Sequence, residues 1–382
     1  MLKATSVSKS AHPDHQRYRF PFIRPLIPPV TEWAEHLELA YGARWFSNFG
    51  PVTRKFESQL GHRFCGSNEI MITASNCTAG ISAALIALKV HGAVLIPAFT
   101  FPATMSAVIM AGAEPCVLDV DLETWCLSLS RLEKSVRSGK YDAVVLVAPF
   151  GLPRDFSEHF QICQKYNVPV VIDNAAGLGG KVVALPDENC FEVFSLHATK
   201  PFAIGEGGVI RSQSHHAEAL RLALNFGLEH GAPATGCWGI NGKLPEVAGA
   251  IGLAVLESYD EVLARRRSVA QSYIELLRDY DSLALCTDVQ SAPWQSFPVL
   301  FSSPTVAQRF LKHAAEKGLQ AGAGYHPTLE NWPRTRSLGD SPNARFLAER
   351  MMLLPVYSDG TEDEVAEMSQ ILRHSLEAAL TD

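Results

Sequence analysis

Short apolar runs alternate with helical patterns between about residues 68 and 211. The runs are rich in Val and Ile and have the length of buried strands; they lie at 69–75, 93–99, 114–120, 142–150, 168–174, 193–199 and 207–212. Segments such as 78–90 and 157–167 between them have helical apolar spacing. This alternation predicts an α/β domain whose mostly parallel central sheet is covered by helices on both faces.

The pattern changes after about residue 250. It predicts a long amphipathic helix at 257–280, a strand at 293–301, and helices at about 305–317 and 342–352. Thr361 and Glu364 have capping-box spacing and indicate a last helix, and Ser130 with Glu133 has the same spacing earlier in the chain. We therefore predict an N-terminal arm at 1–24, partly flexible or lying on a partner, a large α/β domain at 25–250 and a smaller α+β domain at 251–382.

Composition favours a large buried core. Hydrophobic residues make up 47% of the 382 residues and charged residues only 19%, against a usual charged share of about 25%. The low share of charged residues therefore indicates either a large interior or a surface that is partly covered by another subunit. The net charge of −7 argues against broad binding of nucleic acid or anionic membranes, although it does not exclude a small anionic ligand.

Other signals point to a cytoplasmic protein without a structural metal. No apolar run approaches the roughly 20 residues that span a bilayer, and the first residues lack the apolar segment of a signal peptide. Eight cysteines are scattered without CxxC or zinc spacing, and HEXXH does not occur. We expect reduced thiols and no metal site.

Three junctions between predicted elements carry candidate chemistry. The strand 69–75 leads into a helix start where Asn76 and Thr78 could help the backbone bind an anion, or could simply cap the helix. Asp173 ends the strand 168–174, where it could hold a cationic ring nitrogen or cap a turn. Lys200 precedes a glycine-rich loop and is either a nucleophile whose pKa is lowered by burial or an ordinary surface lysine.

Together these junctions are more informative than each alone. An anion cradle, a carboxylate and a lysine are the groups that pyridoxal 5′-phosphate (PLP) requires. The glycines at 205, 207 and 208 form neither GxGxxG nor a P-loop, which weakens a nucleotide-dehydrogenase interpretation.

With these junctions in place, the chain resembles the DegT/DnrJ/StrS aminotransferases, PLP enzymes that mostly act on nucleotide-linked keto-sugars. The resemblance spans about residues 25–375 and implies the three-layer PLP-transferase fold of type I. It rests on ordered motifs at 44–57, 75–85, 97–104, 119–125, 170–180, 194–208 and 239–253.

The resemblance also implies roles for individual residues. Lys200 would be the Schiff-base lysine and proton carrier, and Asp173 would pair with the pyridinium nitrogen. The remaining cofactor contacts would be Asn76, Cys77, Thr78, Ala79 and Ser195 around the phosphate, Phe101 on the ring, and Ala176. Asn241 would reach the phosphate from a neighbouring subunit of a homodimer. Asn48, Tyr325 and His326 lie in segments that line the sugar pocket, with a core Phe101, a turn Asn48 and a packed Tyr325–His326 as the plain structural alternatives.

Three positions depart from the family pattern. Cys77 replaces a usual glycine and requires a negative φ. Ala176 replaces a usual Gln or His, whose place a water or Asn174 could take. Phe226 replaces a usual histidine, which suggests an altered pocket contact.

The implied reaction is a transamination. Glutamate or glutamine would convert PLP to its pyridoxamine form (PMP), which would aminate a keto-sugar, expected to be a nucleotide-diphosphate-linked keto-deoxyhexose. Lys200, where a dehydroxylating branch has histidine, favours this reaction. The alternatives are a cyclitol aminotransferase or aminohydroxybenzoate-type enzyme of the same fold, and a non-enzymatic PLP-fold regulator.

Overall fold

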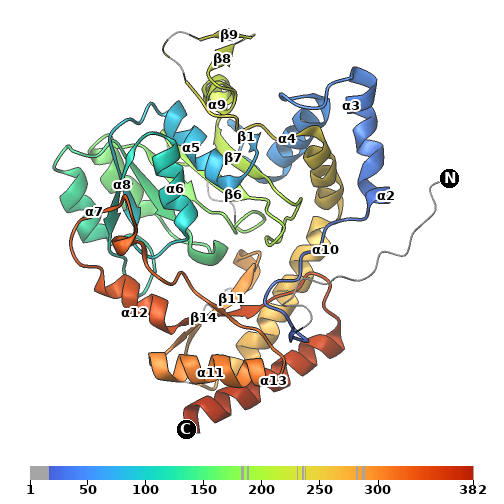
Figure 1. Cartoon of the computed structure of the whole chain (residues 1–382), viewed down its shortest axis with the longest axis vertical. Coiled ribbons are helices and arrows are strands. Elements are labelled where there is room, and N and C mark those ends of the chain that lie inside the picture. The colour runs from blue at the N-terminus through green and yellow to red at the C-terminus, as the bar shows by residue number, and fades with distance from the viewer. Residues whose placement is uncertain are drawn as a thin grey trace.

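A mixed eight-stranded sheet forms the centre of the larger part of the protein (Figure 1). The computed structural model describes residues 17–181, 185–186, 189–229, 231–234, 236, 238–280, 283–285 and 289–381. The strand order is β1-β7-β6-β5-β4-β2-β3-β13. The strands are β1 (Glu69–Ala74), β2 (Ala93–Pro97), β3 (Glu114–Leu118), β4 (Ala143–Val147), β5 (Val170–Asp173), β6 (Cys190–Ser195), β7 (Gly208–Gln213) and β13 (Arg336–Ser337).

The sheet confirms the predicted α/β architecture. Every pairing from β6 through β5, β4, β2 and β3 to β13 is parallel, whereas β7 runs antiparallel to both β1 and β6. Because Ser195 at the end of β6 pairs with Gly208 at the start of β7, the segment between them is a loop at the carboxyl end of β6. Lys200 lies in this loop.

Helices cover both faces of the sheet, as expected for strands that carry apolar residues on both faces. Val145 of β4 packs in the core that contains α5, α6 and α9, whereas Val144 and Leu146 pack with α7 and α8 on the opposite face. Helix α4 and the first half of α10 cover that opposite face beside β1 and β7. The helices are α4 (Pro51–Phe64), α5 (Cys77–Ala87), α6 (Pro102–Met110), α7 (Leu129–Val136), α8 (Ser157–Lys165), α9 (Ala217–Leu224) and α10 (Glu246–Leu277).

Helix α10 connects the large part to the C-terminal part and begins earlier than the predicted 257–280. The predicted domain boundary at 250/251 therefore falls inside a helix. The C-terminal part contains an antiparallel sheet of order β10-β11-β14-β12 with helices packed on it. Its elements are β10 (Leu283–Leu285), β11 (Ser296–Phe301), α11 (Pro304–Glu316), β12 (Gly322–Ala323), α12 (Pro342–Arg350), β14 (Met351–Pro355) and α13 (Glu362–Thr381).

Local details correct two predictions and confirm a third. The helix predicted to reach residue 352 ends at Arg350, because the buried run from Met351 enters β14. Ser130 is not a cap: α7 begins at Leu129, and Ser128 occupies the N-cap position. The Thr361 capping box is confirmed, since its hydroxyl accepts from the Glu364 amide at 3.2 Å and the Glu364 carboxylate accepts from the Thr361 amide at 3.1 Å.

The predicted arm is anchored where the structure describes it. Residues 1–16 lie outside the described part. Phe20 is buried and bridges to Leu319, and Arg24 pairs with Asp359 and Glu364 at 2.9 Å, so residues 17–24 lie on the C-terminal part of their own chain. Short helical elements follow at α2 (Val30–Trp33), η1 (Ala34–Leu37) and α3 (Glu38–Ala43).

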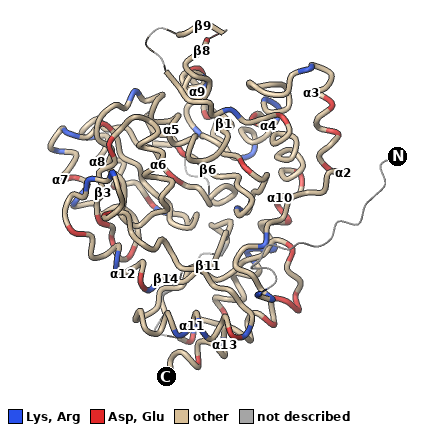
Figure 2. The backbone as a smooth tube through the Cα atoms, in the orientation of Figure 1, with Lys and Arg blue, Asp and Glu red and all other residues tan. Residues whose placement is uncertain are grey.

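Charged residues lie mainly on the outer helices and loops, with acidic and basic positions intermixed (Figure 2). Among the described residues, no helix combines the length and apolar character needed to cross a membrane. In the same residues, no group of His, Cys, Asp and Glu has an arrangement suited to a metal ion. The remaining short elements are η2 (Pro149–Gly151), η3 (Ser214–His216), β8 (Leu228–Glu229), β9 (Ala232–Pro233), η4 (Val289–Ser291) and η5 (Leu329–Asn331).

Candidate active site

Lys200 lies in the loop between β6 and β7 and is held by a residue from the C-terminal part. Its Nζ donates a hydrogen bond of 2.8 Å to Oε1 of Gln295, which directly precedes β11. Burial lowers the pKa of the Lys200 amine, although nearby Asp173 and Cys77 act in the opposite direction. A larger fraction of the amine is therefore in the neutral, nucleophilic form at a given pH than at a surface lysine.

Asp173 ends β5 and is buried with its carboxylate engaged. Oδ2 accepts a 2.6 Å hydrogen bond from the Thr104 hydroxyl, and Oδ1 accepts from the Ala175 amide at 3.2 Å. Burial nevertheless raises the pKa of Asp173, because the hydrogen bonds and Lys200 offset only part of the desolvation. A cationic group placed beside this carboxylate would stabilise its ionised form.

The start of α5 lies directly beside the start of β7. A Cβ on Gly208 would lie 2.5 Å from the Asn76 carbonyl carbon and 2.7 Å from the Cys77 amide nitrogen, so only glycine permits this approach. Because Gly208 pairs with Ser195, the Ser195 hydroxyl belongs to the same corner of the sheet. The first amides of α5 have no carbonyl one turn earlier in the helix, which makes this end suited to an anion.

The predicted phosphate residues are thus assembled, with one qualification at Ala79. Asn76 is the N-cap of α5, and its Oδ1 accepts the Ala79 amide at 2.8 Å. The capping alternative is therefore realised for Asn76. Binding of a phosphate by the Ala79 amide would require that hydrogen bond to open, whereas the Thr78 side chain takes no part in the cap.

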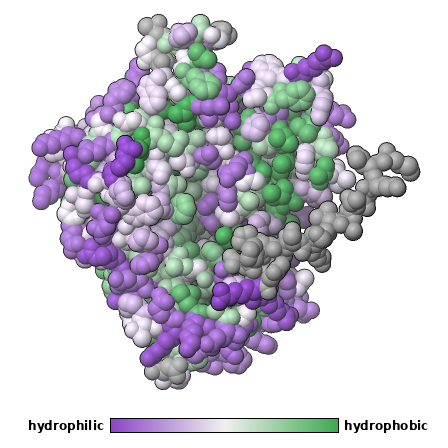
Figure 3. Space-filling model, viewed as in Figure 1, coloured by the Kyte–Doolittle hydropathy of each residue, from purple (hydrophilic) through white to green (hydrophobic). Residues whose placement is uncertain are grey.

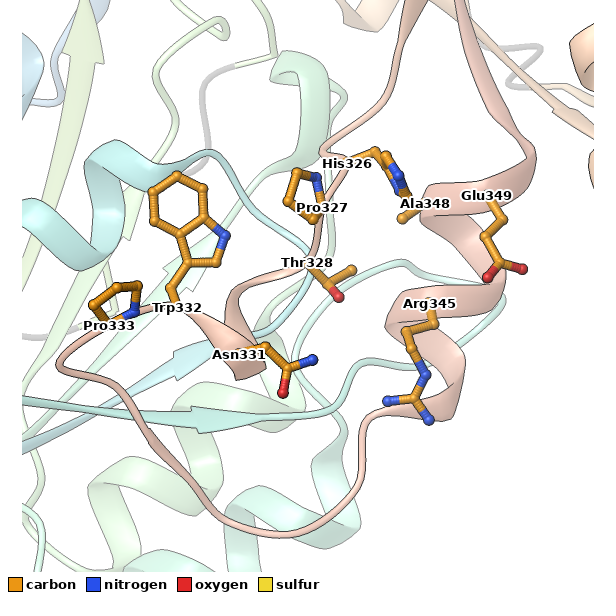
Figure 4. Close-up of a pocket in the computed structure, with 9 residues that line it drawn as sticks. All are labelled: His326, Pro327, Thr328, Asn331, Trp332, Pro333, Arg345, Ala348 and Glu349. Atoms are coloured by element: carbon orange, nitrogen blue, oxygen red, sulfur yellow. The ribbon is translucent and has the colours of Figure 1, made fainter.

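Tyr325 belongs to the same region as Asp173, whereas His326 faces elsewhere. The Tyr325 ring stacks on Phe150 with centroids 4.5 Å apart, and burial raises the pKa of its hydroxyl, with Asp173 contributing in the same direction. His326 is exposed and lines a separate pocket against α12. Figure 4 shows it close to Ala348 and Glu349, with Trp332 on the far side of that pocket. The structure therefore separates these two neighbours.

The other predicted ligand residues lie on the surface. Phe101 at the N-cap of α6 is 63% exposed, which argues against the core alternative. Asn241 is exposed, and its Oδ1 accepts from Lys243 at 2.7 Å. Asn48 is exposed in the loop between α3 and α4 and has a positive φ of 58°, as a turn asparagine would.

The departures from the family pattern have simple structural settings. Cys77 is the first residue of α5 and does not have a positive φ, so its side chain is tolerated. Ala176 is buried against Gly151. A Cβ added to Gly151 would lie 2.3 Å from the Ala176 carbonyl oxygen. The side-chain NH₂ of Asn174 donates to Glu192 at 2.8 Å, whereas its Oδ1 is buried without a hydrogen-bond partner among the described residues. Phe226 is 51% exposed, and the Lys243 amine lies 4.4 Å from its ring centroid.

The sequence interpretation missed Thr104 and Gln295. Thr104 closes the predicted motif 97–104 and contacts Asp173 across 69 positions, and Gln295 contacts Lys200 across 95 positions. A threonine one helical turn after Thr100, to which it hydrogen bonds at 2.9 Å, was a weak available signal. Gln295, a polar residue within a predicted strand, gave none.

The residues present fit PLP. Lys200 can bond to the cofactor's carbonyl carbon, buried Asp173 can face its ring nitrogen, and the start of α5 with Ser195 can receive its phosphate. The close packing at Gly208 holds the start of α5 against β7, the strand that follows the loop carrying Lys200.

Comparison with known proteins agrees with this assignment. Residues 30–373 match the model of the DegT/DnrJ/EryC1/StrS aminotransferase family. Protein Rv3402c of Mycobacterium tuberculosis is 34% identical in an alignment of 269 positions that covers 67% of this chain and 64% of that protein, so the match spans less than two thirds of its length. The dTDP-4-amino-4,6-dideoxy-D-glucose transaminase of Shigella dysenteriae is 29% identical over 89% of this chain and 94% of its own.

Solved structures show the same fold. A structure described as a putative PLP-dependent aminotransferase from Bacillus cereus has a TM-score of 0.83 at 28% identity, covering 92% of this chain and 99% of its own. DesI, solved in the presence of its TDP-sugar product, has a TM-score of 0.83 at 26% identity, covering 95% and 96%.

Proposed function

Since the chain belongs to the DegT/DnrJ/EryC1/StrS aminotransferase family, we propose that it is a PLP-dependent enzyme that moves an amino group from glutamate or glutamine to a keto-sugar. The observation that carries this proposal is the proximity of a partly buried lysine, whose pKa is lowered, to a buried aspartate at the carboxyl end of β5. Ligands of open α/β sheets bind at such strand ends.

The chain's own residues divide the work. Asp173 keeps a proton on the ring nitrogen of the cofactor, and Thr104 fixes the orientation of that carboxylate. The start of α5 and Ser195 hold the phosphate. Lys200 Nζ binds the cofactor and later takes and returns the proton at the reacting carbon. When bound, PLP supplies the carbonyl that accepts the amino group and a ring that withdraws electrons.

The proposed acceptor is a nucleotide-diphosphate-linked keto-deoxyhexose. The support comes from relatives described as dTDP-sugar transaminases and from DesI with its TDP-sugar product. A panel of nucleotide-linked keto-sugars and keto-cyclitols, each with glutamate or glutamine, tests this choice by following amine transfer. Turnover of the cyclitols alone would replace it with the cyclitol alternative, and bound PLP without exchange from any donor would favour a regulator.

The lysine assignment has its own test. Lys200→Ala removes the only atom proposed to bond to the cofactor, so the variant mixed with PLP should lose the absorbance near about 420 nm of the lysine-linked form. Lys140→Ala, at an exposed position, should retain it. Unchanged absorbance in Lys200→Ala would refute the assignment.

We also propose a homodimer with shared active sites. Large apolar residues are exposed along the segment before α4, including Val30, Tyr41 and Phe46, of which Tyr41 is 67% exposed. Figure 3 shows an apolar area in the region of α2 to α4. Patches of this kind are typical of subunit interfaces. Exposed Asn241 is the residue proposed to reach the partner's phosphate.

A further inference from the structure

The hydrogen bond between Lys200 and Gln295 joins the two parts of the protein at the reacting amine. Lys200 is carried by the loop after β6 in the large part, whereas Gln295 directly precedes β11 in the C-terminal part. The Nζ–Oε1 distance is 2.8 Å. The C-terminal part therefore contributes directly to the position of the Lys200 amine.

Gln295 is itself fixed by a buried arginine. Arg266 of α10 donates to the backbone carbonyl of Gln295 at 3.2 Å and to that of Trp294 at 3.1 Å. Its other nitrogen donates to the Val356 carbonyl at 2.9 Å and to the Ser358 hydroxyl at 3.0 Å. This arrangement ties residues 294–295 to residues 356–358 and gives Gln295 a defined place beside the Lys200 loop.

The hydrogen-bond acceptor of Lys200 is an uncharged amide, and this affects the pKa of the lysine. A carboxylate at this distance would favour the ammonium form strongly, whereas an amide oxygen accepts a hydrogen bond without adding charge. An amide can also present its NH₂ group to the lone pair of a neutral amine, so one side chain can accommodate both protonation states of Lys200.

On the assumption of the proposed PLP chemistry, we propose that Gln295 is a positioning residue that holds the Lys200 amine in place whenever it is not bonded to the cofactor. The lysine is released from the cofactor during each half-reaction and must return to the same place. A fixed neutral acceptor keeps the amine ordered at the site without converting it into a permanently protonated ion pair.

Other charged or titratable groups around Lys200 are the background against which Gln295 acts. Asp173 at the end of β5 and Cys77 at the start of α5 both favour the ammonium form. Arg24 and Arg266 line a small cavity together with Lys200 and Gln295. Arg24 is paired with Asp359 and Glu364, and Arg266 donates to carbonyls and Ser358. The flanking loop adds His197 and Glu206, which lie 3.5 Å apart.

Two nearly isosteric substitutions separate positioning from a structural role. Gln295→Glu places a carboxylate on the ammonium and should raise the pKa of Lys200 by about one to three pH units. Gln295→Met removes the acceptor while keeping the volume, and should move the pKa of Lys200 downward. A merely structural role predicts no displacement of opposite sign in the two variants.

The first measurement uses the full-length apoprotein and needs no catalysis. Lys200 is labelled competitively with trace acetic anhydride at pH 6 to 11, and mass spectrometry of its peptide gives the midpoint of its reactivity. Gln308→Glu, which adds the same charge at an exposed position on α11, is the matched control and should leave the midpoint unchanged. Circular dichroism confirms that each variant is folded.

The second measurement follows the rate at which added PLP gains its lysine-linked visible absorbance. At pH 7 the Gln295→Glu variant should react about tenfold more slowly for each unit by which the pKa of Lys200 rises. The reaction rate of Gln295→Met should reach its plateau at lower pH than that of wild type. Midpoints that coincide with wild type, or that move in the same direction in both variants, would overturn the proposal. If the two variants show these shifts but the wild-type protein aminates no keto-sugar, the proposed function alone is refuted.

Discussion

At the scale of single residues, burying the Lys200 amine should cost the apoprotein stability. The pKa of Lys200 is lowered in the folded state, so between that pKa and about 10.5 the unfolded chain binds more protons than the folded one. Wild-type stability therefore rises with pH across this window. Lys200→Met, which lacks the buried ammonium, should be the more stable apoprotein at pH 7, and its advantage should shrink as pH approaches 10.5.

Urea unfolding of both apoproteins between pH 7 and 10 checks this expectation. The advantage should decrease by at most about 1.4 kcal/mol per pH unit. Lys140→Met, at an exposed position, provides a control in which the difference from wild type stays small and independent of pH. An advantage for Lys200→Met that grows with pH would contradict the assigned burial.

Residues whose role follows from a strand end could be predicted from the sequence, and residues chosen by tertiary contact could not. Asp173 and Lys200 stand out because a buried strand and a glycine-rich loop mark their positions. Thr104 and Gln295 became visible only when the fold brought them to Asp173 and Lys200. Adjacency in sequence does not give the direction of a side chain: Tyr325 packs on Phe150, whereas His326 lines a pocket against α12.

At the scale of elements, Glu246 couples the starts of two helices, α10 and α4. It is the first residue of α10 and is fully buried, and its carboxylate accepts the Val52 amide at 2.6 Å and the Thr53 hydroxyl at 2.7 Å at the start of α4. Glu246→Ala should therefore destabilise the protein by about 2–3 kcal/mol, because charged hydrogen bonds and a helix cap are both lost.

Chemical unfolding measures this loss. Glu246→Gln retains an acceptor but loses the charge at the helix N-terminus, so a loss of roughly 1 kcal/mol is expected. Glu257→Ala on the exposed surface of the same helix should change stability little. Equal effects of the Ala substitutions at 246 and 257 would show that the cap contributes nothing.

Elements with a clear period and a punctuating residue were predictable. Strands β1 to β7 of the large sheet were found because each is short, apolar and followed by a turn or a polar residue. The first turns of α10 were missed because their small, buried residues, such as Ala250 and Gly252, show no amphipathic period. β14 was missed because its apolar residues follow α12 without a turn.

At the scale of the whole molecule, the two parts share more than one connection. β13 from the C-terminal region joins the edge of the large sheet through β3, and the apolar core is continuous from α5 to Phe297 and Tyr357. The sequence pattern changes near residue 250, inside α10, which connects the mixed large sheet to the antiparallel C-terminal sheet. It could not indicate that a later segment returns to the first sheet, because a strand of two residues has no detectable period.

The proposed dimer leads to a prediction about Asn241. Its side chain is exposed, and its Oδ1 accepts a hydrogen bond from Lys243, so Asn241→Ala should leave folding intact. If Asn241 reaches the partner's phosphate, the variant should bind PLP more weakly, by about tenfold for a lost hydrogen bond to a charged group. Asn68→Ala, also exposed, is the control. Affinity equal to wild type would reject the contact.

A mixed dimer distinguishes a contact across the interface from one within a subunit. In a dimer of one Lys200→Ala subunit and one Asn241→Ala subunit, a contact across the interface combines both lesions in one site and leaves the other site intact. Such a preparation, purified with two different affinity tags, should bind PLP at about half of its sites with wild-type affinity and should show the lysine-linked absorbance there. A contact within the subunit would instead leave both sites impaired. Wild-type affinity in the mixed dimer therefore requires that each site be built from two chains.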